Sequence, residues 1–123
     1  MIGKALIRDI FDGMNGTEKR RAIELEAMKR SGLIHDWRYE AMTFKLADDT
    51  RYTPDFWIIE NDGACEFQEV KGFLRDDALV KIKVAARMFP FRFVMYTASS
   101  KKEGGGWQIR DFTDAEHAVP PKK

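Results

Sequence analysis

Two carboxylic acids and a lysine stand at the ends of two neighbouring apolar runs in this chain. Asp55 opens the run DFWIIE, Glu69 and Lys71 close the run ACEFQEVK, and the triplet Asn61-Asp62-Gly63 lies between the runs. A pair of carboxylates can hold a hard divalent cation, and a nearby ammonium group can orient water and offset charge that builds on a phosphate. An ion pair at the strand ends is the purely structural alternative. The chemistry therefore depends on whether a hairpin places the three side chains together.

The length of the turn decides which side chains share a face, because residues directly opposite each other in an antiparallel pair lie on the same face of the sheet. A two-residue turn at Asp62-Gly63 would place Asp55 opposite Val70 and leave Glu69 on the other face. A three-residue loop, in which Gly63 takes the left-handed conformation, places Asp55 opposite Glu69.

The apolar pattern favours the three-residue loop. In that register the side chains that join the acids are apolar, and the polar side chains gather on the other face. A bulge at Pro54 would reach the same result by another route. We therefore predict that Asp55, Glu69 and Lys71 share a face. The apolar set is Trp57, Ile59, Cys65 and Phe67, and the polar set is Glu60, Glu66 and Gln68.

A helix is predicted ahead of this hairpin, over Thr17–Arg30, with Thr17 as its cap and Ser31-Gly32 as its stop signal. Glu18 lies on the same helical stripe as the apolar residues Ala22 and Leu25. It is either a first-turn acid that favours the helix dipole or an inward-facing acid of the site.

The remaining pattern predicts strands and one further helix. Alternation indicates strands over 37–46, 51–60 and 64–71, followed by a helix from Asp76 or Asp77 to about Phe89, a strand over 91–97 and a possible fifth strand over 107–112. A strand, a helix and a strand in succession form a right-handed crossover, so the third and fourth strands should be parallel. The predicted fold class is α/β, with an αβββαβ order and a mixed sheet flanked by helices.

The length of 123 residues suits one domain with a single core, and the net charge of +1 means that any nucleic-acid contact must come from a local patch. A single cysteine, the lack of a leader and the lack of a long apolar run predict a soluble, cytoplasmic protein that does not bind a membrane. We expect an extension over 1–13 (a short helix or a dimer contact), a domain over 14–112 and a loose tail over 113–123.

The spacing of the site residues resembles a known signature. Pro54-Asp55, thirteen further residues and Glu69-Val70-Lys71 resemble the PD-(D/E)XK motif of the restriction-endonuclease-like nuclease superfamily, whose core has the same αβββαβ order. Glu18 matches an acid that many members carry on the first helix. The segments YTPDF, EVKG and VKIKVAA also resemble a small phage and prophage family of nucleases, some described as Holliday-junction resolvases. The YTPDF and EVK pair is similar to the endonuclease subunit of heteromeric transposases as well.

The resemblance implies roles for the matching positions. Asp55 and Glu69 would be ligands of Mg²⁺, for which Mn²⁺ can substitute, with the Val70 carbonyl as a third oxygen. Lys71 would be the catalytic lysine. Glu18 would be an accessory acid that acts directly or through metal-bound water.

The resemblance also implies an activity and its partners. The chain would be a metal-dependent DNA endonuclease of bacterial or prophage origin, structure-selective for four-way junctions and homodimeric, without a small-molecule cofactor. The alternatives are a nucleic-acid-binding module without activity and a transposase endonuclease subunit. Several cations are candidate DNA contacts, although each also suits an ordinary solvated surface: Lys81 and Lys83 on the second helix, Lys19 and Arg20 beside Glu18, and Lys101 and Lys102 in the loop that follows the fourth strand.

Overall fold

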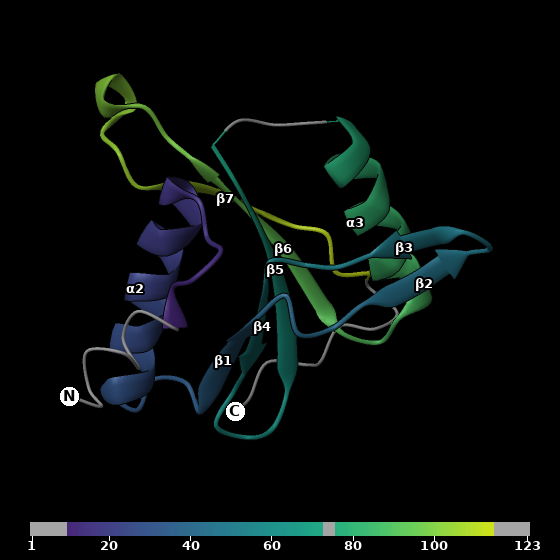
Figure 1. The fold of residues 1–123 in the computed structure, drawn as a ribbon, viewed down its shortest axis with the longest axis horizontal. Coiled ribbons are helices and arrows are strands. Elements are labelled where there is room, and N and C mark those ends of the chain that lie inside the picture. Colours follow the sequence, from purple (N-terminus) through teal and green to yellow (C-terminus); the bar gives the residue numbers. More distant parts are fainter. Residues whose placement is uncertain (1–9, 73–75, 115–123) are drawn as a thin grey trace.

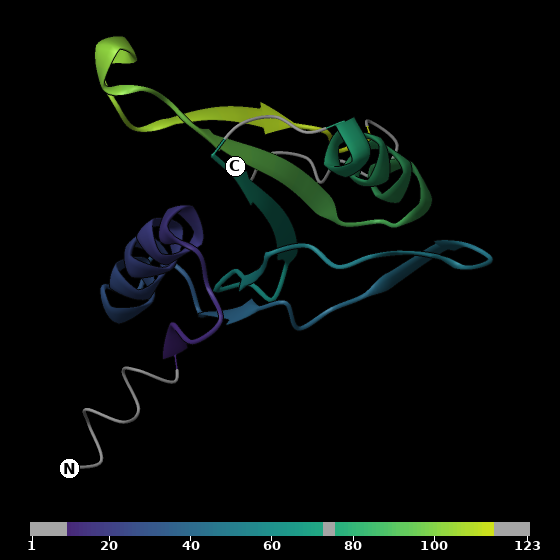
Figure 2. The ribbon, with the colours of Figure 1, turned by 45° about the horizontal axis from the view of Figure 1, so that its top comes forward.

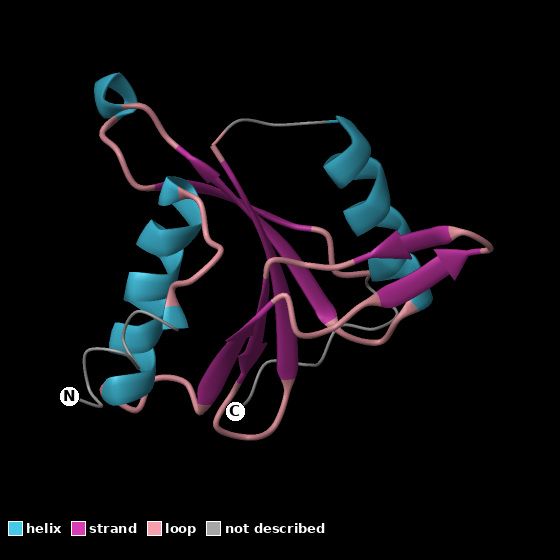
Figure 3. Cartoon of the chain, in the orientation of Figure 1, coloured by secondary structure: helices cyan, strands magenta, loops and turns pink. Residues whose placement is uncertain are grey.

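The computed structural model describes residues 10–72 and 76–114. Within these residues, two α-helices and one 3₁₀ turn accompany seven strands. Figures 1 and 3 show their arrangement. The helices are α2 (Gly16–Arg30) and α3 (Asp76–Met88), and the 3₁₀ turn is η1 (Lys101–Glu103). The strands are β1 (Asp36–Tyr39), β2 (Phe44–Ala47), β3 (Thr50–Tyr52), β4 (Phe56–Ile59), β5 (Cys65–Lys71), β6 (Arg92–Ala98) and β7 (Trp107–Asp111).

A five-stranded sheet with the order β1-β4-β5-β6-β7 forms the centre of the molecule. The β5–β6 pair is parallel and the other three pairs are antiparallel, so the sheet is mixed. The predicted crossover through α3 and the predicted fifth strand are both confirmed. The fold class is thus α/β, with a small second sheet of β2 and β3 beside the main one.

The two helices cover opposite faces of the main sheet, as Figure 2 shows from a second direction. Each face is sealed by its own apolar cluster, and this burial is the main favourable contribution to folding. The α2 cluster contains Met14, Ala22, Leu25, Ile34, Trp37, Phe56, Ile58 and Val70. The α3 cluster contains Phe44, Tyr52, Phe67, Ile82, Ala85, Ala86, Phe93 and Met95.

Two of the predicted strands are interrupted, and this part of the prediction is wrong. The segment 37–46 divides into β1 and β2, and the segment 51–60 divides into β3 and β4. Glu40 has a φ of 47°, which is outside the range of an extended strand. Pro54 has no N–H to donate to a neighbouring strand. Between these breaks β2 and β3 pair only with each other and leave the main sheet as a separate ribbon.

The hairpin between β4 and β5 has the predicted register. Trp57 pairs with Phe67 and Ile59 with Cys65, which extends to Asp55 opposite Glu69. The Glu60 N–H donates to the Ala64 carbonyl at 2.8 Å, so the loop contains three residues. Gly63 has a φ of 88°, the left-handed conformation that this loop requires.

The start of α2 differs by two residues from the prediction. Asn15, not Thr17, is the cap: its side chain accepts from the Glu18 N–H at 2.8 Å, and the Glu18 carboxylate accepts from the Asn15 N–H at 2.9 Å. This reciprocal pair is a capping box, which satisfies two donors that the first turn leaves unpaired.

The chain ends are described in part. Residues 1–9 of the expected extension and residues 115–123 of the expected tail lie outside the described residues. Ile10 and Phe11 pack against the α2 cluster. No helix in the described part of the chain is long and apolar enough to cross a membrane.

Candidate active site

Asp55 has two acidic neighbours: Glu18 from the first turn of α2 and Glu69 from β5. Asp55 comes directly before β4, and its Oδ2 accepts from the Val70 N–H of β5 at 2.7 Å. The residues Glu18, Asp55 and Glu69 are buried, with 8%, 7% and 4% of their surfaces exposed. Burial of three acids at one place is costly unless each has hydrogen-bond or ionic partners, so their partners define the site.

Both oxygens of Glu69 have a partner within the chain. The Tyr52 hydroxyl donates to Oε1 at 2.8 Å, and the Lys71 ammonium lies 2.9 Å from Oε2. The predicted proximity of Glu69 and Lys71 is confirmed. The ion pair that the sequence offered as a structural alternative is present too, so it does not by itself separate the two interpretations.

Glu18 combines the two roles that the sequence left open. Its Oε1 closes the capping box with Asn15 and also accepts from the Tyr39 hydroxyl at 3.1 Å. Its carboxylate is near enough to Asp55 to contribute to the raised pKa of that residue. Glu18 is therefore both the acid that caps α2 and a neighbour of the hairpin acids.

The charges of these groups perturb one another. Burial, followed by the negative charge of Glu69 and contact with Glu18, raises the pKa of Asp55 to about 8, although the Val70 N–H opposes the rise. Burial lowers the pKa of Lys71, but the bond to Glu69 and the charges of Asp55 and Asp77 outweigh it, so the net pKa is raised. The raised pKa of Lys71 favours its charged form, and the raised pKa of Asp55 favours its protonated form.

The donor set suits a hard divalent cation that retains water. Mg²⁺ commonly uses one or two carboxylates together with waters and phosphate oxygens. Asp55, Glu69 and the carbonyl of Val70 would supply oxygen only. Within residues 10–72 and 76–114, no cluster of three or more histidine, cysteine, aspartate or glutamate side chains is arranged to hold a metal by itself. A cation held here would therefore draw at most two carboxylates from the described residues and the rest of its ligands from elsewhere.

Comparison of the chain with protein-family models, curated proteins and solved structures found no match. The interpretation of the site consequently depends on the geometry described above and on the resemblance of its motif.

The candidate DNA contacts differ in their exposure and in their contacts within the chain. Lys19, Lys83, Lys101 and Lys102 are exposed, and Lys81 is half-buried. Arg20 is half-buried: its guanidinium lies 4.3 Å from the centre of the Trp107 ring and donates to the Gly106 carbonyl at 3.0 Å. Figure 1 shows the start of α2, η1, the end of β5 and the start of α3 at the same end of the sheet.

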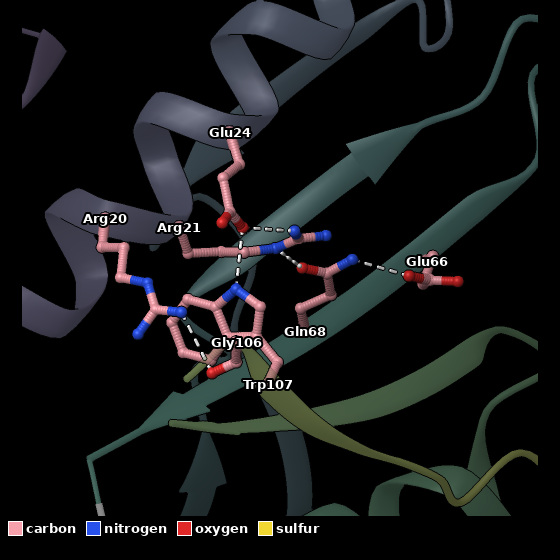
Figure 4. Close-up of polar contacts among 7 residues, drawn as sticks. All are labelled: Arg20, Arg21, Glu24, Glu66, Gln68, Gly106 and Trp107. Carbon is pink, nitrogen blue, oxygen red and sulfur yellow. Dashed lines mark hydrogen bonds and ion pairs between the residues drawn. The ribbon is translucent and has the colours of Figure 1, made fainter. Parts of the chain in front are cut away.

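A polar network, buried at Arg21 and Gln68, joins α2 to β5, as Figure 4 shows. Gln68 and Glu69 are neighbours on β5, so the network lies on the face opposite Glu69. Arg21 donates to the Gln68 side chain at 3.0 Å and to Glu24 at 2.8 Å, and Gln68 donates to Glu66 at 2.7 Å. The Trp107 indole of β7 donates to Glu24 at 2.8 Å. Of the polar face predicted from the sequence, Glu66 and Gln68 are therefore buried and Glu60 is half-buried. The network fixes the helix that carries Glu18 to the strand that carries Glu69.

Sequence reasoning missed the two phenols that donate to site acids, those of Tyr39 and Tyr52. Tyr52 was visible in the segment YTPDF, three residues before Asp55. Its contact with Glu69 depends on the separate β2–β3 ribbon, which strand alternation does not reveal.

Proposed function

We propose that this protein is a metal-dependent DNA endonuclease that hydrolyses phosphodiester bonds. The observation that carries the proposal is the proximity of Asp55 to the acids Glu18 and Glu69, of which Glu69 is paired with the Lys71 ammonium. A structural ion pair requires one acid and one base. It does not account for Asp55, a further buried acid whose pKa is raised to about 8.

The order of the elements supports the same proposal. With the β2–β3 ribbon set aside, the elements α2, β1, β4, β5, α3 and β6 have the αβββαβ order of the restriction-endonuclease-like core. Asp55 and Glu69 belong to the second and third strands of that order. We propose that the chain has this core.

The residues divide the chemistry as follows. Asp55, Glu69 and the Val70 carbonyl would hold Mg²⁺ or Mn²⁺, which when bound supplies Lewis-acid stabilisation of charge on the phosphate. Lys71 donates hydrogen bonds that orient the attacking water and offset charge on the phosphate oxygens. Glu18 accepts a proton from the water. The water oxygen bonds to phosphorus, the bond to the 3′ oxygen breaks, and solvent protonates that oxygen.

A four-way DNA junction is the proposed substrate class, and it rests on the motif resemblance. Symmetrical cutting of two strands requires two active sites, so the proposed enzyme is a homodimer. Lys81, Lys83, Lys19, Lys101 and Lys102 are proposed to contact the phosphate backbone. Arg20 would contact the phosphate backbone only to the extent that its guanidinium is not held by the Gly106 carbonyl and the Trp107 ring.

Cleavage assays test the proposal. A synthetic four-way junction, a flap, a nicked duplex and a plain duplex are incubated with the protein, with and without Mg²⁺. We expect Mg²⁺-dependent cutting that Asp55→Asn and Lys71→Ala reduce at least about 100-fold, the scale of loss when one electrostatic group of a site is removed. Lys29→Ala is the matched control, because Lys29 pairs with Asp36 and lies in the last turn of α2, whereas Glu18 lies in the first.

Three results would contradict the proposal. They are a wild type that cuts none of the substrates, variants that cut as well as wild type, and cutting that persists with a chelator. DNA binding without cleavage would favour the non-catalytic binding module instead. Preferential cutting of the plain duplex would overturn the junction specificity alone.

A further inference from the structure

Tyr52 occupies a place that the separate β2–β3 ribbon creates. It is the last residue of β3, it is buried, and it pairs across the ribbon with Phe44. Its hydroxyl donates to Oε1 of Glu69, seventeen residues further along the chain, at 2.8 Å. Thr53 and Pro54 follow it directly and lead to Asp55, so one short segment serves both hairpin acids.

The β2–β3 ribbon packs against the main fold through Phe44 of β2. The Phe44 ring lies 4.9 Å, 4.7 Å and 5.5 Å, centre to centre, from the rings of Phe67, Phe89 and Phe93. Aromatic contacts at these distances stabilise the packing beyond the burial of their area. Because Phe44 and Tyr52 are cross-strand partners on the inward side, this packing also fixes the ring of Tyr52.

We propose that Tyr52 is a positioning residue for the metal ligand Glu69, an inference that rests on the proposed function. The phenol holds Oε1 and thereby restricts rotation of the carboxylate. Oε2, which contacts the Lys71 ammonium at 2.9 Å, remains to be shared between Lys71 and a divalent cation. Groups that orient a metal ligand in this way typically change metal affinity or activity by about 10–100-fold when they are removed.

The phenol also satisfies a buried acid, so a purely structural role predicts a loss of stability alone. The two roles are separated by a measurement of metal affinity on folded protein. Tyr52→Phe removes only the hydroxyl and keeps the ring in the α3 cluster. Tyr96→Phe is the matched control, because the Tyr96 ring faces Arg21 and Trp107, away from Glu69.

The experiment titrates Mn²⁺ into each full-length variant and follows free Mn²⁺ by electron paramagnetic resonance. Circular dichroism and thermal unfolding without metal establish that each variant is folded. We expect Tyr52→Phe to weaken Mn²⁺ binding about tenfold or more, and Tyr96→Phe to leave it within about twofold. In a Glu69→Gln background, Tyr52→Phe should have no further effect on the remaining affinity, since the phenol acts through Glu69.

The outcomes distinguish this inference from the proposed function. If wild type binds Mn²⁺ and cuts DNA but Tyr52→Phe binds Mn²⁺ as tightly, the positioning role is wrong and the nuclease proposal stands. Equal weakening by Tyr52→Phe and Tyr96→Phe would also overturn the positioning role. If wild type binds no Mn²⁺ and cuts nothing, the nuclease proposal is wrong and the positioning role is overturned with it.

Discussion

Replacement of Asp55 by asparagine should stabilise the metal-free protein while it abolishes cleavage. The raised pKa of Asp55, about 8 against an ordinary value of 3.8, means that the fold disfavours the ionised carboxyl. Between these two values the folded protein keeps a proton that the unfolded chain releases, so stability falls as the pH rises from about 4 to about 8. Asparagine is neutral throughout and escapes this loss.

The magnitude follows from the same shift. If the rise of the pKa from 3.8 to about 8 belonged to Asp55 alone, it would correspond to on the order of 5 kcal/mol. Glu18 and Glu69 take part in the same charge repulsion, so the effect does not belong to Asp55 alone. We therefore expect Asp55→Asn to raise the free energy of unfolding by about 1–3 kcal/mol at pH 8 and by almost nothing at pH 4. For a chain of this length, that gain raises the melting temperature by roughly 4 °C per kcal/mol.

Urea and thermal unfolding in a chelating buffer at pH 4.5 and pH 8 measure the effect. Asp55→Ala is the matched control, because alanine also removes the charge but leaves the Val70 N–H without the acceptor that asparagine retains. An unpaired buried donor costs about 1–3 kcal/mol, so Asp55→Ala should be less stable than Asp55→Asn at both pH values. The reasoning is refuted if Asp55→Asn is less stable than wild type at pH 8, or if its gain is the same at both pH values.

Three further predictions concern other parts of the molecule. Mg²⁺ at millimolar concentration should raise the melting temperature of wild type more at pH 8 than at pH 6, because metal and proton compete for Asp55. It should not raise the melting temperature of Asp55→Asn. A shift that does not depend on pH would contradict this competition. Arg21→Met should lower the free energy of unfolding, measured with urea, by about 2–4 kcal/mol, because it leaves the Gln68 side-chain oxygen without its donor. Lys19→Met on the exposed side of α2 should change that free energy by less than about 0.5 kcal/mol. Equal effects would show that the network adds no stability. Gly63→Ala should cost about 1–2 kcal/mol, because Gly63 has a φ of 88°, and Gly63→Asn should cost less; no difference between the two in a denaturation series would argue against this loop conformation.

The register of the central hairpin was predictable because two independent signals agreed. The alternation of apolar residues and the left-handed preference of Gly63 both selected a three-residue loop, and the paired residues confirm it. The helix cap was predictable in principle as well. Asn15 and Glu18 have the spacing of a capping box, a signal that Thr17 does not share.

The interruptions of the strands were not predictable from the same signals. A residue such as Glu40 in the left-handed region leaves the alternation of polar and apolar side chains unchanged on both sides of the break. Pro54 indicated a strand end, an edge or a bulge without deciding among them. The site residue that depends on the ribbon, Tyr52, was missed for this reason, whereas the acids that depend on the hairpin were found.

The adjacency of Gln68 and Glu69 on β5 has a consequence for how this sequence can change. Neighbours on a strand point to opposite faces, so β5 presents the acid to Tyr52 and Lys71 on one side and the amide to Arg21 on the other. Loss or gain of one residue in the loop at Gly63 would exchange the two, placing an uncharged amide among the acids and a carboxylate beneath the helix. The proposed catalysis and the attachment of the helix would then fail together. The length of this surface loop should therefore tolerate change far less than its exposure suggests.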